Sequence, residues 1–177
     1  PYLYTVKIST PEETICQKVG IRTISIKNGV VLINEKPVKF KGVNRHDSSP
    51  FTGAVVSRVD AMFDLRIMKE ANINASHYPN APWFPELCSE YGFYVIAEAD
   101  LESHGVQDQY GGGTEKTFSQ LAEDPAYREA VIDRSRRNVI RDKNQCCVTF
   151  WSLGNESGMG TNIEEAGRWV KQYDPTR

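Results

Sequence analysis

The sequence lacks the features of a membrane protein or of a strongly basic nucleic-acid-binding protein. No apolar run approaches the roughly 18 residues that a membrane-spanning helix needs. The first residues do not follow the basic, apolar and small-residue order of a signal peptide. With 21 basic and 23 acidic residues the formal net charge is -2, which argues against strong attraction to nucleic acids or acidic membranes. We therefore expect neither as a partner.

Cysteines are few and form no metal-binding pattern. The four are Cys16, Cys88, Cys146 and Cys147, and their spacing matches no zinc motif. Adjacent cysteines rarely bridge each other, so we predict reduced thiols in a cytoplasmic protein. Because the chain begins without Met, we expect it to be part of a longer polypeptide.

Motifs of several enzyme classes are also missing. There is no Gly-X-Ser-X-Gly turn, which a serine hydrolase would need, and no closely spaced pair of histidines for zinc. The three glycines at 111–113 lack the spacing of a phosphate-binding loop. We interpret them as a flexible loop.

The first 27 residues have the alternation of β-strands. Tyr2, Tyr4, Val6 and Ile8 would share one face of a half-buried strand, and a second strand follows a turn at 10–13. We interpret residues 1–26 as the end of an all-β domain and residues 27–177 as a second domain. The latter begins with an Asn-Gly pair at 28–29, which is typical of a hairpin turn.

After residue 38 short apolar segments alternate with helical periodicity. Strands are predicted near 38–43, 73–76, 93–97 and 148–153, and helices near 58–72, 83–91, 124–143 and 162–173. Such alternation predicts an α/β fold with a parallel sheet and right-handed crossovers. Four such units are half of an eight-stranded barrel, and an open doubly wound sheet is the alternative.

All three histidines follow predicted strands. His46, His77 and His104 lie just beyond three of them, and Glu156 lies just beyond the fourth. In a parallel barrel these strand ends line one mouth, where active sites are built. The shared position indicates a site and not three unrelated loop residues.

Two kinds of chemistry fit the side chains at these positions. Glu156 follows an apolar strand and is preceded by Asn155, which suits a carboxylate acid/base. Alternatively, Glu102, His104 and Glu156 could converge on a cation, and two carboxylates with one imidazole suit Mg²⁺ better than structural zinc.

Four motifs resemble those of the β-galactosidases of glycoside hydrolase family 2. They are Gly-Val-Asn-Arg-His-Asp at 42–47, Ser-His-Tyr-Pro-Asn at 76–80, Glu-Ser-His-Gly at 102–105 and Trp-Ser-Leu-Gly-Asn-Glu-Ser-Gly at 151–158. The resemblance runs over about residues 20–177. It implies the first half of a (β/α)8 TIM barrel, preceded by the C-terminal strands of an immunoglobulin-like β-sandwich.

The resemblance also implies roles for individual residues. Glu156 would be the general acid/base in retaining hydrolysis of terminal β-D-galactosides such as lactose. His46 and His77 would bind the galactosyl group, and Asn155 would contact its 2-hydroxyl. Mg²⁺ would be held by Glu102, His104 and Glu156, whereas the ligands of any Na⁺ would lie outside the matched motifs.

The nucleophile of the family is a second glutamate on a later strand, beyond residue 177. The chain alone is therefore not expected to hydrolyse galactosides. Its expected partners are a galactoside and the remainder of the barrel, supplied by the same polypeptide or by a complementary subunit, and the full-length protein is expected to be a homo-oligomer.

Two departures from the family pattern and two alternative functions remain. About three residues, including an arginine, are missing between Ala75 and Ser76. They are either deleted or omitted from the sequence as printed, and we favour omission. Residues 144–147 also differ, at the opposite end of a strand from Glu156. The alternative functions are a β-glucuronidase of the same family and a sugar-binding fragment without catalysis.

Overall fold

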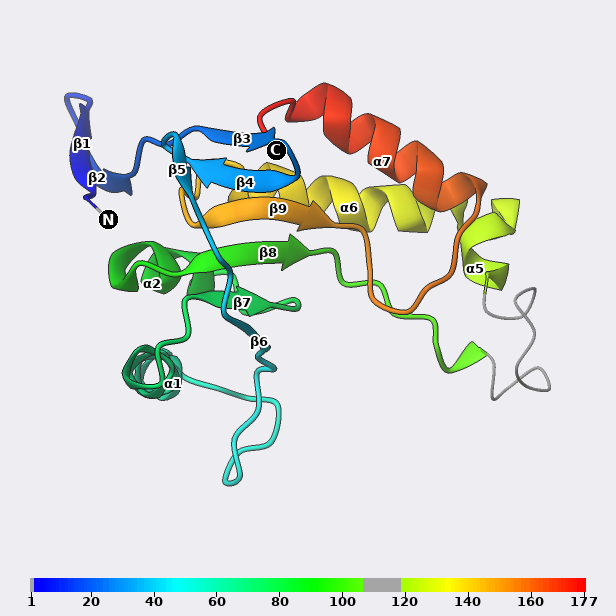
Figure 1. Cartoon of the computed structure of the whole chain (residues 1–177), viewed down its shortest axis with the longest axis horizontal. Helices are drawn as coiled ribbons and strands as arrows, with labels where there is room; N and C mark the ends of the chain where they lie inside the picture. Colours follow the sequence, from blue (N-terminus) through cyan, green and yellow to red (C-terminus); the bar gives the residue numbers. More distant parts are fainter. Residues whose placement is uncertain (1, 107–118) are drawn as a thin grey trace.

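The computed structural model describes residues 2–106 and 119–177, so the glycine loop predicted at 111–113 lies outside the described residues. Its strands form a two-stranded sheet, β1-β2, a three-stranded sheet, β3-β4-β5, and a four-stranded sheet, β6-β7-β8-β9. Figure 1 shows helices around the four-stranded sheet and the β1-β2 hairpin at one end of the molecule.

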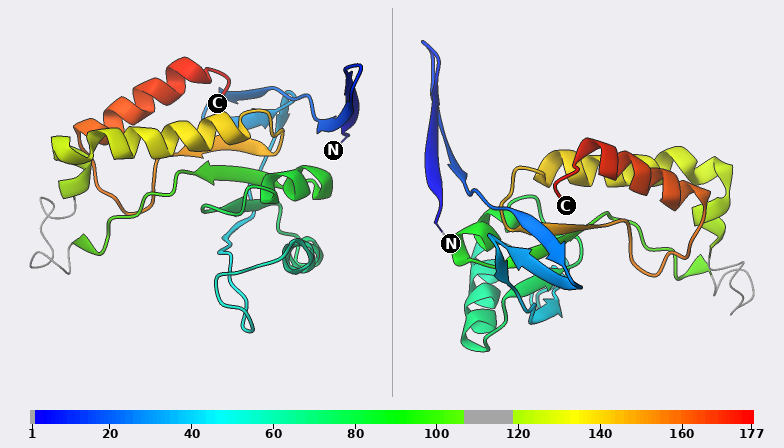
Figure 2. Two further views of the ribbon diagram at one scale, coloured as in Figure 1. Left: turned by 180° about the vertical axis from the view of Figure 1, so that it is seen from behind. Right: turned by 45° about the horizontal axis from the view of Figure 1, so that its top comes forward.

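The hairpin of β1 (Tyr4–Ser9) and β2 (Thr14–Val19) pairs in the predicted antiparallel way, with Tyr4 opposite Val19. The expectation of a half-buried strand is wrong, however, because every residue of β1 is exposed. The hairpin projects away from the rest of the chain (Figure 2), so nothing in the described residues covers its apolar face.

A second hairpin joins β3 (Ile24–Lys27) to β4 (Val30–Ile33), and β5 (Lys36–Pro37) adds to its edge. Asn28 and Gly29 both have positive φ, 52° and 75°, as the predicted turn requires. This hairpin spans the boundary predicted between residues 26 and 27, and that boundary stays a prediction.

The four-stranded sheet consists of β6 (Gly42–Asn44), β7 (Ala75–His77), β8 (Tyr94–Glu98) and β9 (Val148–Ser152). All neighbouring strands are parallel, and their order in space is their order in the sequence. A doubly wound sheet would reverse direction at an inner strand. The sequential order is that of a barrel, and the fold is the first half of one.

Two of these strands are shorter than predicted. β6 does not include residues 38–41, and β7 has only three residues. Ala75 pairs with Gly42 on one side and with Tyr94 on the other. The strand thus runs continuously through Ala75 and Ser76. The omission that we favour between these two residues stays a prediction.

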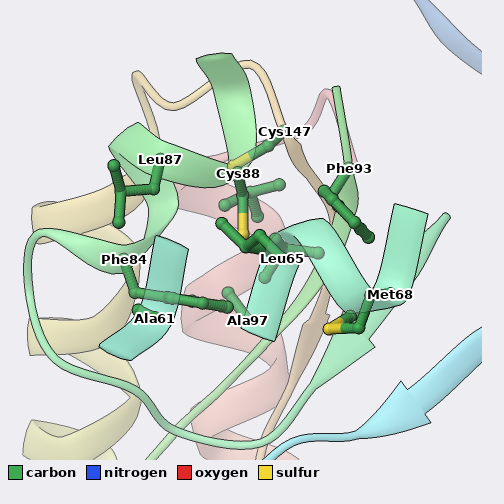
Figure 3. Close-up of a cluster of buried hydrophobic side chains, with 11 residues drawn as sticks. Ala61, Leu65, Met68, Phe84, Leu87, Cys88, Phe93, Ala97 and Cys147 are labelled. Carbon is green, nitrogen blue, oxygen red and sulfur yellow. The ribbon is translucent and has the colours of Figure 1, made fainter. Parts of the chain in front are cut away.

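The first two crossover helices close the main core. α1 (Arg58–Glu70) begins at Ser57, whose side chain and backbone form a reciprocal capping box with Asp60, and these hydrogen bonds lower the pKa of Asp60. α2 (Phe84–Tyr91) ends at the predicted Gly92. Side chains of both helices pack with those of β8 and β9 (Figure 3), and Leu65, Phe84 and Cys88 are completely buried.

A second cluster of buried side chains forms where α6 (Arg128–Asp142) packs on α7 (Thr161–Tyr173). Asp124 does not cap α6 directly as predicted. It caps the short 3-10 helix η1 (Pro125–Tyr127) before it, and α5 (Gln120–Glu123) was not predicted. Both elements have three or four residues, too few to show a helical period.

The four cysteines form no disulfide in this structure, and the reduced state of their thiols stays a prediction. Burial raises the pKa of the Cys147 thiol to about 12, and that thiol donates to the carbonyl of Pro85 at 3.2 Å. Cys88 is buried as well, and burial raises its pKa. These two thiols are core residues.

The end of α7 is held by a buried ion pair between Asp174 and Arg177. Asp174 also accepts hydrogen bonds from Trp151 Nε1 at 2.9 Å and from Thr176 Oγ1 at 2.5 Å. Burial alone would raise the pKa of Asp174, but these hydrogen bonds and the charge of Arg177 outweigh it and lower the pKa to about 2. Arg22 lies nearby, and burial and the charge of Arg177 lower its pKa to about 10.

Candidate active site

The candidate site lies where the four parallel strands end. His46 follows β6, His77 ends β7, Glu102 and His104 follow β8, and Asn155 and Glu156 follow β9. Because the strands are parallel and neighbouring, these residues share one edge of the sheet (Figure 1). That edge is the carboxyl-terminal one, at which barrel enzymes place their sites.

Glu156 and His104 contact each other across the ends of β9 and β8. His104 Nδ1 lies 2.5 Å from Glu156 Oε2, and both side chains are about half exposed, at 49% and 54%. Next to them, Asn155 Nδ2 donates to Glu102 Oε1 at 3.2 Å. The structure therefore brings together the four polar residues predicted on these two loops.

The backbone holds these two loops side by side. Glu102 and Asn155 form a parallel bridge beyond the ends of the strands, and the Asn155 amide donates to the Leu101 carbonyl at 2.9 Å. A β-carbon at Gly154 would lie 2.7 Å from that same carbonyl oxygen, so only glycine permits this approach. Glu156 itself has a φ of 45°, a conformation that is rare outside glycine and recurs at functional sites.

His46 and His77 meet through the ring of Tyr78. The Tyr78 centroid lies 4.3 Å from that of His46 and 4.7 Å from that of His77. Tyr78 has a φ of 83°. The two histidines predicted to bind a sugar thus form one surface with a tyrosine that the sequence reasoning did not single out as a site residue.

Glu98 is a second site residue to which the sequence reasoning gave no role. It ends β8, its side chain is only 2% exposed, and it bonds His77 and Ser152. The sequence did contain a signal for this residue, namely a carboxylate at the end of a strand that is otherwise apolar. Such a residue must be paired, because an unpaired buried charge is costly.

Arg45 connects three segments below the histidines. Its guanidinium bonds Asp64 of α1 at 3.0 Å, Asp47 at 2.6 Å and Asn80 at 2.7 Å, and it lies over the Phe84 ring. Arg45 is buried, and one of its nitrogens has no hydrogen-bond partner within residues 2–106 and 119–177. Asp47 and Asn80, noted in the sequence as polar neighbours of the histidines, are therefore held in place by this arginine.

The predicted magnesium ligands are only partly assembled. Within residues 2–106 and 119–177, no group of three His, Cys, Asp or Glu side chains is arranged to hold a metal ion. His104 and Glu156 are in contact, while Glu102 bonds Asn155. The donor types suit a hard cation, and magnesium stays a prediction.

Trp151 contacts residues that follow the end of α7. Its indole donates to Asp174, and Arg177 lies over its ring at 5.1 Å. Both partners follow the end of α7, whereas Glu156 precedes its beginning. Trp151 thus belongs to the packing of α7 on the sheet.

These observations define a group of polar side chains at the carboxyl ends of parallel strands, and comparison with known proteins identifies the family. The chain matches the TIM barrel domain of the glycosyl hydrolases family 2 over residues 24–177. The chain belongs to this family.

Curated relatives are β-galactosidases. Their identity to this chain is 46% for the protein of Actinobacillus pleuropneumoniae, 43% for that of Staphylococcus xylosus and 40% for that of Pectobacterium atrosepticum. Each comparison covers 100% of this chain but only 20%, 18% and 17% of the relative. The chain therefore spans about one fifth of the length of these relatives.

Solved structures with a similar fold include β-glucuronidases. One from an uncultured Clostridium has a TM-score of 0.75 and 27% identity, covering 99% of this chain and 31% of that one. One from Ruminococcus gnavus has a TM-score of 0.77 and 26% identity, and the comparison covers 98% of this chain and 31% of that one. Among the described residues, none of the helices has the length and apolar character needed to cross a bilayer.

Proposed function

We propose that this chain supplies the acid/base half of the active site of a retaining β-galactosidase. The observation that carries the proposal is the contact of Glu156 with His104 beside the bonded pair of Glu102 and Asn155. In this mechanism a carboxyl group first protonates the leaving oxygen and then activates a water molecule. Glu156 would take that role at the mouth of the barrel, and identities of 40–46% to named β-galactosidases favour the galactoside.

The other residues would bind the substrate or a cation. His46 and His77 would contact the galactosyl hydroxyls, and Asn155 would contact the 2-hydroxyl. Magnesium would be held by Glu102, His104 and Glu156, where it would supply positive charge beside the acid/base. Sodium would bind elsewhere.

The nucleophile would come from outside these residues. A retaining enzyme needs a second carboxylate about 5 Å from the first, and none of the 177 residues is assigned that role. The chain alone would then be inactive, and the remaining strands would complete the barrel from the same polypeptide or from a complementary one. We place the complete enzyme in the cytoplasm, in line with the unpaired cysteines, as a homo-oligomer acting on lactose-type galactosides.

The test uses a full-length polypeptide that contains this chain. Glu156→Gln should lower hydrolysis of lactose by about 10²–10⁴-fold, which is the usual contribution of a general acid/base. An aryl galactoside with a good leaving group should still react to the glycosyl-enzyme, and added azide should then release a β-galactosyl azide. Glu164→Gln, an exposed carboxylate of α7, is the matched control and should leave the rate unchanged.

Loss of both steps without rescue by azide would contradict the acid/base role. Turnover of an aryl galactoside by the isolated 177-residue chain, lost in Glu156→Gln, would contradict the expected inactivity. A β-glucuronidase is the second candidate, because the similar solved structures carry that name. Parallel assays with aryl galactoside and aryl glucuronide decide between the two.

A further inference from the structure

One of the two carboxylate oxygens of Glu98 contacts two partners. Oε2 lies 2.8 Å from His77 Nε2 and 2.6 Å from Ser152 Oγ, which donates its hydrogen. The Glu98 side chain is 2% exposed, whereas that of His77 is 23% exposed. The carboxylate is thus buried behind the imidazole.

The protonation of the His77 ring follows from this arrangement. An ionised carboxylate can only accept hydrogen bonds, and a buried one must be paired because an unpaired charge costs several kcal/mol. Nε2 therefore carries a hydrogen that it donates to Glu98. The nitrogen that remains to serve a ligand is Nδ1.

The plane of the ring is fixed as well. Tyr78 stacks on His77 with an angle of 29° between the rings, and His46 lies on Tyr78 at 33°. Turning the His77 ring over would break the bond to Glu98 and would disturb this stack. The bond to Glu98 and the stacking on Tyr78 thus fix the orientation of the His77 ring, and the bond to Glu98 fixes which nitrogen carries the proton.

We propose that Glu98 is a positioning residue for saccharide binding, which keeps the proton of His77 on Nε2 and leaves Nδ1 as the nitrogen that contacts a sugar hydroxyl. The identity of the sugar rests on the proposed function. The state of the ring rests on the geometry alone, so the two can fail separately.

The state of the ring can be measured by ¹⁵N NMR on the 177-residue chain. With only three histidines in the sequence, His46→Gln and His104→Gln variants assign the signals. At about pH 8 we expect a proton on Nε2 of His77. In Glu98→Gln both tautomers should be populated, because an amide can donate to Nε2 or accept from it. Ser152→Ala, which removes only the second partner of Glu98, should retain the Nε2 proton.

A bare Nε2 in the unchanged chain would overturn the proposal, and so would a Glu98→Gln chain with unaltered His77 signals. Both results are independent of any activity. They therefore stand even if the full-length polypeptide acts on a different sugar.

A pair of substitutions at His77 tests the role in binding, in the full-length polypeptide. The amide of glutamine reaches about as far as Nε2, and that of asparagine about as far as Nδ1. His77→Gln should keep the contact with Glu98 and the thermal stability but raise KM for an aryl galactoside about tenfold, the equivalent of one lost hydrogen bond. His77→Asn should keep more of the affinity and lose thermal stability, and the opposite ranking would refute the assignment of Nδ1 to the ligand.

Discussion

The buried carboxylate of Asp174 should make the stability of the chain depend on pH. Its pKa is lowered from 3.8 to about 2 in the folded chain, where burial is outweighed by hydrogen bonds from Thr176, Trp151 and Arg177. Each pKa unit is worth about 1.4 kcal/mol, so the difference corresponds to roughly 2 kcal/mol of folding free energy. Asp174→Asn removes the charge and retains the shape.

A carboxylate with a lowered folded pKa stabilises the folded state above the unfolded pKa, and the stabilisation is lost as pH falls through the folded pKa. At pH 7 we expect Asp174→Asn to lower the free energy of unfolding by about 2 kcal/mol. The difference between the two proteins should shrink between about pH 4 and pH 2.

Urea denaturation at pH 7, 5, 3 and 2 measures this difference, and comparing variant with parent cancels the titration of the other carboxylates. Asp133→Asn is the control. Asp133 pairs with Arg137 on the exposed face of α6, with side chains 44% and 79% exposed, and such pairs contribute less than about 1 kcal/mol. The expectation would be refuted if Asp174→Asn lowered the free energy of unfolding by the same amount from pH 7 to pH 2. It would also be refuted if the loss were no larger than that of Asp133→Asn.

Three further predictions concern the site and its supports. Gly154→Ala should lower the melting temperature and disturb the His104 signals in NMR, because the alanine β-carbon would lie 2.7 Å from the Leu101 carbonyl oxygen. An unchanged melting temperature would contradict the close approach of the Gly154 backbone to Leu101. Ser57→Ala should lower the free energy of unfolding by about 1 kcal/mol in chemical denaturation, because the α1 capping box is lost. Ser57→Thr should lower it by less, and equal losses in the two variants would argue against the cap. Mg²⁺ should raise the melting temperature of the full-length polypeptide and EDTA should reverse it, with the effect reduced in Glu102→Gln; an equal rise in that variant would place the ion elsewhere.

Long elements could be predicted from the sequence, and short ones could not. The spacing of Leu65 and Met68 marked α1, and the apolar run before Glu98 marked β8, because each extends over enough residues to show a period. β7 has three residues and α5 has four, so neither can show one. The exposed β1 was mistaken for a half-buried strand, since alternation indicates which residues share a face but not whether that face is covered.

The site was predictable as a set of strand ends and not as a set of contacts. His77 and Glu156 could be placed at one edge of the sheet because parallel strands align their ends. The bond from His77 to Glu98 joins residues 21 positions apart, and the bonds of Arg45 depend on how α1 and α2 pack. Pairings of this kind arise from tertiary structure, so periodicity and local motifs do not reveal them.

The bridge between Glu102 and Asn155 has a consequence for engineering this barrel. Because the bridge and the close approach of Gly154 to Leu101 tie the two loops together, neither can be exchanged for a loop of another enzyme on its own. A graft that brings a new loop after β9 would need the matching loop after β8. The two loops of this half of the barrel should therefore be transplanted as a pair.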